Sequence, residues 1–221
     1  MWLKDLVDRR NFEINRVIRY FIITDLLFIG GWGFIGPVFS IFIVDEVRNA
    51  SIVTVGIVTA LYWVLKSFLQ VPIALYIDRR KGEKDDYAAL LLGLFLAGCA
   101  AFSFVFARSV PFLLGSTILQ SVAFALYIPA WSAIFSRHLD KSRYALEWSL
   151  NSTSLGLASG ATALLSGVLV KFVGFNSVFI LAALLSFVGV IFLLFLPDIT
   201  LPSRSSPKPI IKDHSPKLIQ H

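Results

Sequence analysis

Two ionisable side chains, Asp25 and Lys66, interrupt long apolar stretches of the sequence. If those stretches cross a membrane, such residues are costly to bury and usually functional. At a helical rise of about 1.5 Å per residue, Asp25 lies about 12 Å past Val17 and Lys66 about 18 Å before Asp78. We therefore expect Asp25 to face a cavity, and either to pair with Lys66 or to exchange a proton. A static structural ion pair is the alternative.

Proton exchange is the chemistry that this pair could perform. Burial and a neighbouring cation act in opposite directions on the proton affinity of a carboxyl group. A small rearrangement around Asp25 could therefore switch its protonation, which is the physical requirement for coupling transport to protons. Asp25 and Lys66 are thus the candidate proton-coupling residues.

Aromatic and amide side chains recur at helical spacing in the same stretches. Those in the fourth stretch, Gln120, Tyr127 and Trp131, are separated by seven and four residues and so share one helical face. Aromatic rings with amide and charged groups suit sugars, or amphipathic and cationic compounds; interfacial anchoring and core packing are the alternative. The candidate substrate-binding residues are Trp32, Tyr62, Gln120, Tyr127, Trp131 and Asn151. Asn151 and Glu147 either face the cavity or bind the loop between Arg137 and Arg143.

A charged run, ALYIDRRKGEKDDY, separates the second and third apolar stretches. Asp78 ends the preceding stretch, and Gly82 permits a tight turn. Arg79 and Arg80 can pair with carboxylates of a neighbouring bundle. Such contacts break and reform between two conformations, as a gate requires. We therefore expect a gating loop here, the alternative being a solvated loop that only sets topology.

The elements that position these residues are membrane helices. The chain has 221 residues, 57% of them hydrophobic and 15% charged, whereas soluble domains are about 45–50% apolar and about 25% charged. A helix needs about 20 apolar residues to span a bilayer. Six stretches meet or approach that length: 17–44, 52–77, 87–107, 111–136, 146–171 and 176–196. We predict an all-α integral membrane protein, with a six-helix bundle over 17–196, an N-terminal arm over 1–16 and a disordered tail over 197–221.

The distribution of basic residues predicts the topology. Sixteen of the 20 Lys and Arg residues lie in the N-terminal arm, the second and fourth loops and the tail. Because positive charge stays on the cytoplasmic side, both termini are expected in the cytoplasm, in a multi-pass protein of the plasma membrane. No aromatic and basic platform accompanies the charge, so nucleic acid is not an expected partner. The sequence has no nucleotide-binding loop, catalytic triad or metal-ligand cluster, so we expect neither an enzyme nor a cofactor or metal.

Two sequence patterns suggest how the helices are arranged. Pro37-Val-Phe-Ser40 in the first stretch resembles Pro129-Ala-Trp-Ser132 in the fourth. The match predicts an inverted repeat of three helices plus three, a known transporter plan, unless it is a coincidence. Each proline also permits a bend within its span. Gly156 and Gly160 form a G-x-x-x-G pattern, which lets helix backbones approach closely in lipid.

The run from Ala74 to Lys84 resembles the loop signature of the major facilitator superfamily, Gly-x-x-x-Asp-Arg-x-Gly-Arg-Lys. It departs by Ala74 at the first glycine, one residue inserted before Gly82, and Glu83 at a basic position. The run YIPAWSAIFSRHLDKSRYALEWSLNSTSLGLASG also resembles the family's fourth and fifth helices. The resemblance implies that the first and fourth helices line a cavity and that the charged loop latches the outward-facing state.

The family usually has two six-helix halves, so the resemblance implies that this chain forms one half of the fold. Two parallel copies in a homodimer would supply both walls of a cavity; a heteromeric partner or a truncated remnant are alternatives. The expected function is secondary active transport of a small organic solute, sugar-like or amphipathic and drug-like. Alternating access of the homodimer would be coupled to protons through Asp25. The alternative function is a non-transporting membrane subunit that scaffolds or regulates a partner.

Overall fold

The computed structural model describes residues 16–79, 84–140 and 143–195, and within these residues the chain is helical and forms no strand. The helices are α2 (Arg16–Gly33), α3 (Gly36–Glu46), α4 (Ile52–Arg79), α5 (Lys84–Phe104), α6 (Val110–His138), α7 (Tyr144–Val173) and α8 (Phe175–Leu194). Because α2 and α3 together make one span, these residues contain six segments long and apolar enough to cross a membrane. The predicted all-α membrane fold is confirmed, while the predicted tail lies outside the described residues.

The observed helix boundaries follow the predicted stretches, with the largest difference in the third. That stretch was expected to reach residue 107, but α5 ends at Phe104. The backbone N–H of Arg48, just beyond α3, donates a hydrogen bond to the Arg108 carbonyl at 3.1 Å. After α5, the chain therefore forms a backbone hydrogen bond to the loop that follows α3, and it does not continue as a helix.

A break divides the first span at the place where the sequence predicts a bend. The N–H groups of Phe34 and Ile35 bond to carbonyls three residues back, at 3.2 and 3.0 Å, and α3 then begins with Pro37 in its first turn. Proline lacks an N–H, so it fits a first turn at no cost, whereas inside a helix it removes a backbone hydrogen bond. The prediction of a bend is therefore confirmed for Pro37, whereas α6 runs through Pro129 without interruption.

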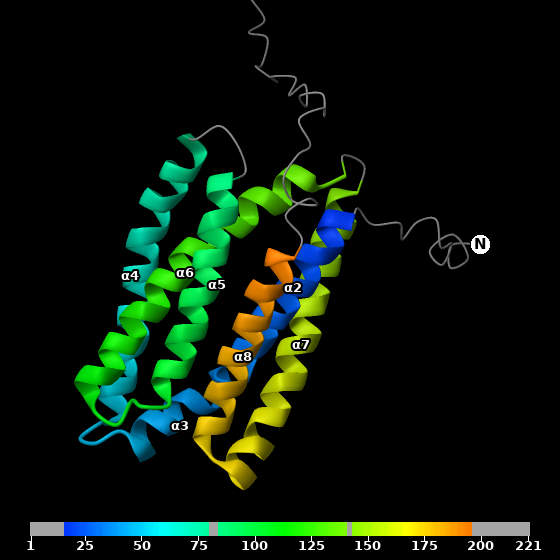
Figure 1. The fold of residues 1–221 in the computed structure, drawn as a ribbon. Helices are drawn as coiled ribbons and strands as arrows, with labels where there is room; N and C mark the ends of the chain where they lie inside the picture. Colours follow the sequence, from blue (N-terminus) through cyan, green and yellow to red (C-terminus); the bar gives the residue numbers. More distant parts are fainter. Residues whose placement is uncertain (1–15, 80–83, 141–142, 196–221) are drawn as a thin grey trace, which may run out of the picture.

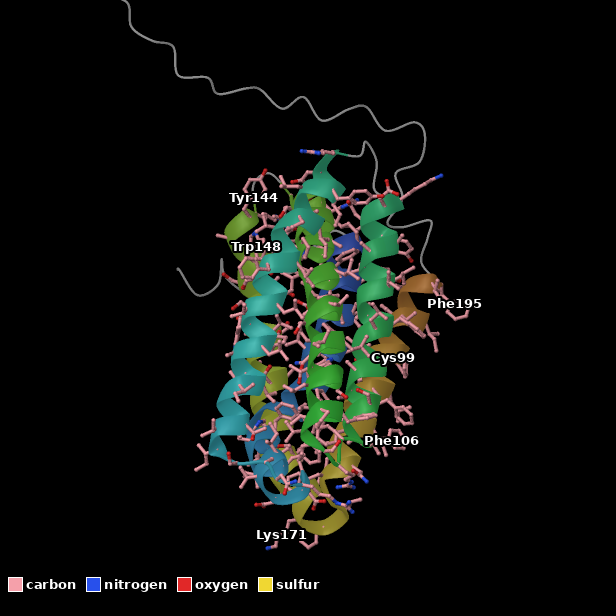
Figure 2. All side chains as sticks on the ribbon, turned by 90° about the vertical axis from the view of Figure 1, so that its left-hand side faces the viewer. Cys99, Phe106, Tyr144, Trp148, Lys171 and Phe195 are labelled. Carbon is pink, nitrogen blue, oxygen red and sulfur yellow. The ribbon has the colours of Figure 1, made fainter. Side chains whose placement is uncertain are left out.

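The six spans form two groups of three (Figure 1). In the first group, α6 packs against both α4 and α5; in the second, α2, α7 and α8 pack against one another, and α5 joins α8 between the groups. We call the end at which α2 begins and α8 ends the terminal end of the bundle. Figure 2 shows Tyr144 and Trp148 toward this end and Lys171 toward the opposite one.

Burial is uneven among the helices. In the most apolar part of each span, 50% of the residues are buried in α6, but only 17% in α4 and 6% in α7. Among the described glycines, the closest approach to another helix backbone is at Gly93 of α5, where an added Cβ would lie 2.8 Å from the backbone nitrogen of Tyr127 on α6. Only glycine allows two helix backbones to come so near. Gly93 therefore fixes where α6 holds Tyr127.

Candidate functional site

Asp25 lies in the middle of α2, with 4% of its surface exposed. The Tyr127 hydroxyl on α6 donates a hydrogen bond to Asp25 Oδ1 at 2.7 Å. The Asn151 amide on α7 donates from Nδ2 to Asp25 Oδ2 at 3.3 Å. One carboxyl group thus connects three helices and both helix groups. The structure brings together three residues that the sequence singled out separately.

An aromatic wall borders this polar cluster. Phe28 lies one turn from Asp25 on α2, and its ring centroid is 4.3 Å from that of Tyr127 and 5.2 Å from that of Phe124. The Trp32 ring stands edge-on to Phe124 at 5.0 Å. Sequence reasoning missed Phe28 and Phe124, although their spacing of three residues from Asp25 and Tyr127 places them on the same helical faces.

Two buried polar atoms beside the cluster are left without partners. Among the described residues, no group hydrogen-bonds to Trp32 Nε1 or to Asn151 Oδ1. Buried polar groups are nearly always satisfied, so an exception needs a reason. The amide acceptor belongs to a residue bound to the Asp25 carboxylate, and the indole donor belongs to the aromatic wall; each could engage a polar solute.

Lys66 does not pair with Asp25 in this structure. It is 7% exposed on α4, and its Nζ lies 3.9 Å from the Trp63 ring centroid and 5.3 Å from that of Tyr62. The electron-rich faces of aromatic rings attract a cation strongly where water is excluded. The sequence left two alternatives for Asp25, and the described residues do not form the first of them, an ion pair with Lys66. The reason is that α2 packs against α7 and α8, while the Lys66 side chain contacts aromatic rings of its own helix. The Tyr62 ring also lies 5.9 Å from Phe124, which links Lys66 to the aromatic wall.

The other two residues of the α6 stripe lie away from the Asp25 carboxyl group. Trp131 stacks on Phe135 at 4.5 Å and meets Trp148 of α7 at 6.1 Å, in an aromatic cluster toward the terminal end. Gln120 is half-buried and has no hydrogen bond within the described part of the chain. Common helical spacing put these residues on one face, but that face extends over several turns.

An ion pair joins α5 and α6 at the terminal end. The Arg137 guanidinium donates to the carboxylate of Asp86, which is fully buried while 39% of the Arg137 side chain is exposed. Sequence reasoning missed this pair, because it expected Arg79 and Arg80 of the charged run, and not Asp86, to form the ion pairs. Of the predicted gating residues, Asp78 and Arg79 are exposed on the last turn of α4 and form no ion pair with a described residue. Arg80 and Gly82 lie outside the described residues.

The sequence left open whether Glu147 and Asn151 face the cavity or bind the loop between Arg137 and Arg143, and in the structure the two residues differ. Glu147 is fully buried in the first turn of α7, and its Oε2 accepts a hydrogen bond from the backbone N–H of Asp140 at 3.0 Å. It therefore binds the loop between α6 and α7. Asn151, one turn further along, reaches Asp25 instead.

The comparisons with known proteins agree on the fold. The crystal structure described as "In meso crystal structure of the POT family transporter PepTSo" matches with a TM-score of 0.70 and 17% sequence identity. The match covers 89% of this chain and 40% of that chain, so this chain spans less than half the length of that transporter. No curated protein matches the sequence. The family model described as Major Facilitator Superfamily matches residues 21–219, which is most of the chain. The protein therefore belongs to the major facilitator superfamily.

Proposed function

We propose that the protein is a secondary active transporter that moves a small organic solute by alternating access and couples this movement to protons through Asp25. The observation that carries the proposal is the buried Asp25 carboxyl group, held by Tyr127 and Asn151 from two other helices. Hydrogen bonds to an ionised carboxylate are about twice as strong as those between neutral groups. Protonation weakens both bonds, and Tyr127 and Asn151 belong to different helix groups. A single proton can thereby loosen one group from the other.

The proposed solute is amphipathic or cationic. The wall of Phe28, Phe124 and Trp32 supplies apolar and electron-rich ring surface, and Asp25 supplies a negative charge when ionised. Ligand sites are mostly apolar with a few polar groups that fix orientation, and cations bind well over aromatic faces. Trp32 Nε1 and Asn151 Oδ1 are the unsatisfied groups that could orient the solute.

Solute-driven proton movement tests this proposal. The purified chain is reconstituted into vesicles that contain a pH-sensitive dye, and ethidium or glucose is added outside. We expect ethidium to change the internal pH, and a proton ionophore to abolish the change. Protein-free vesicles are the control. If neither compound moves protons beyond the protein-free level while labelled ethidium still equilibrates, coupling to protons is wrong although transport stands.

We further propose that two parallel copies form the transporter, with the terminal end in the cytoplasm and the chain in the plasma membrane. A Cβ added at Gly156 or Gly160 of α7 meets no atom within 4 Å, so the G-x-x-x-G face is left open by the described residues. Small residues at this spacing allow close helix contact in lipid. The excess of Lys and Arg near the terminal end supports the orientation. A closed two-fold pairing is the commonest way for identical chains to associate.

Replacing Gly160 with Leu is expected to separate the two copies without unfolding either. The larger side chain has room within its own chain but would hold a facing helix away. The mass of the protein in mild detergent, corrected for bound detergent, should fall from two chains to one. Gly115→Leu on α6, where an added Cβ also meets nothing within 4 Å, is the matched control. A single-chain mass for the unaltered protein, together with no crosslinked pair in native membranes, would favour a partner subunit instead.

A further inference from the structure

Glu147 is buried in the bundle, as are Asp25 and Asp86, and the function proposed above does not use it. Its Oε2 binds the Asp140 N–H, but its Oε1 is buried and has no hydrogen-bond partner among the described residues. Fixing the loop requires only one of the two oxygens. The second oxygen is therefore available for another partner.

The position of Glu147 places it on the way from Asp25 to the terminal end. Asn151 follows Glu147 by four residues on α7, so both side chains share one helical face. From the start of α7 at Tyr144, Glu147 lies about 4.5 Å and Asn151 about 10 Å along the axis, at about 1.5 Å per residue. Asn151 contacts Asp25 directly. The order along the face is Asp25, Asn151, Glu147 and then the loop.

Two unsatisfied oxygens belong to side chains on the same face of α7. Asn151 Oδ1 and Glu147 Oε1 are both buried acceptors, about one helical turn apart, and neither has a described donor. One water molecule that donates to both would satisfy them, since buried water typically makes about three hydrogen bonds to such groups. Water held there would lie next to the Asp25 carboxyl group, because the Asn151 amide touches it.

We propose that Glu147 is the proton carrier between Asp25 and the terminal end, and that Asn151 positions the water that connects them. The proposal rests on the role of Asp25 in proton coupling. A protonated Glu147 gives the proton on Oε1 to this water, and the water gives another of its protons to Asp25 Oδ2. Glu147 is then an anion and Asp25 is neutral, so the net charge of the site is unchanged. Proton uptake from the terminal side restores Glu147.

The charges around the two carboxyl groups are compatible with this exchange. Asp140 and Arg143, one of each sign, are the described charged groups that act on Glu147. Facing Asp25 are the Tyr127 hydroxyl on α6 and the uncharged Asn151 on α7. Arg137 is already engaged by Asp86. The charges of Asp140 and Arg143 act in opposite directions on the ionisation of Glu147, so they partly offset each other.

The test follows protonation of Asp25 directly and needs no solute. The full chain in lipid vesicles receives a pH jump from a photoacid, and time-resolved infrared absorption records the C=O stretch of protonated carboxyl groups. The band that Asp25→Asn lacks belongs to Asp25. In Glu147→Gln, the amide oxygen still accepts from the Asp140 N–H but the side chain carries no exchangeable acid. We expect the Asp25 band to reach its full amplitude about tenfold more slowly or worse, since positioned proton carriers typically contribute at least such factors.

A second variant and a control distinguish the loss of a proton carrier from a general disturbance of the structure. Asn151→Leu keeps similar bulk but removes both the oxygen proposed to hold water and the Nδ2 donor to Asp25, and it should also slow the Asp25 band. Glu46→Gln removes a carboxylate at the opposite end, paired with Arg108 at 2.5 Å, and should leave the rate unchanged. A wild-type rate in Glu147→Gln would overturn the relay and leave the role of Asp25 intact. An Asp25 band that never responds to pH would overturn both.

Discussion

Replacing Asp25 with Asn is expected to reduce proton-coupled solute uptake by about a hundredfold or more, the size of effect typical for a lost acid–base group. Asn has nearly the shape of Asp, and its amide oxygen can still accept a hydrogen bond from Tyr127. What it cannot do is change charge, so the attachment between the two helix groups no longer depends on a proton. The measurement is the internal pH change of reconstituted vesicles when ethidium is added.

Solute exchange without a gradient distinguishes a variant that has lost proton coupling from one that no longer folds or transports. In Asp25→Asn, labelled ethidium should still exchange across the vesicle membrane with unlabelled ethidium, because exchange needs movement between the two states but no net proton transfer. Higher ethidium concentrations should be needed, because the variant lacks the negative charge that attracts the cation. Glu46→Gln replaces another carboxylate by an amide away from the site and should retain both activities. Unchanged pH-dependent uptake in Asp25→Asn would contradict the role assigned to this residue.

Replacing Arg137 with Gln is expected to lower the free energy of unfolding by about 3 kcal/mol, the lower end for leaving a buried charge unpaired. The Asp86 carboxylate is fully buried and its Oδ1 already has no partner among the described residues, so Arg137 is its main compensation. The pair also fastens α5 to α6, and α6 carries Tyr127 to Asp25. Reversible unfolding in mixed detergent micelles, followed by tryptophan fluorescence, measures the change.

The double variant Asp86→Asn with Arg137→Gln should be more stable than Arg137→Gln alone, because it removes the unpaired charge along with its partner. The matched comparison is Arg108→Gln at the opposite end, where the side chains of the Arg108–Glu46 pair are 46% and 42% exposed. Exposed pairs contribute about 0–1 kcal/mol. If Arg137→Gln and Arg108→Gln lowered the free energy of unfolding equally, the burial of Asp86 would make no difference to stability.

The spans and the central residue of the site could be predicted because their signals are local. A run of apolar residues long enough to cross a bilayer needs no partner to be recognised, and an ionisable residue within it, such as Asp25, stands out by its cost. Helical spacing also marked Tyr127 and Asn151 as belonging to functional faces. That these faces meet at Asp25 depends on how α2, α6 and α7 pack, which spacing within one helix does not contain.

The contacts that were missed depend on such packing. The depths of Asp25 and Lys66 differ by about one helical turn, which a lysine side chain can span, and this suggested that Lys66 could reach Asp25. In the structure, α4 packs on α6 while α2 packs on α7 and α8. Lys66 is satisfied three residues away, by Trp63 on its own helix. Asp86 could not be distinguished from its neighbours in the charged run, because its burial and its pairing with Arg137 depend on how the helices pack.

The division of the bundle into two groups has a consequence for how the protein is made. The group of α4, α5 and α6 is continuous in sequence and can assemble as it leaves the ribosome, whereas α2 must wait for α7 and α8. Asp25 precedes its donors Tyr127 and Asn151 by 102 and 126 residues. At about 5–20 residues per second, roughly 5–25 s pass before both donors exist. During that interval the nascent first span holds an acidic group that costs about 2.5–3.5 kcal/mol at the centre of a membrane, so this span has to be kept in the membrane before its hydrogen-bond donors are made.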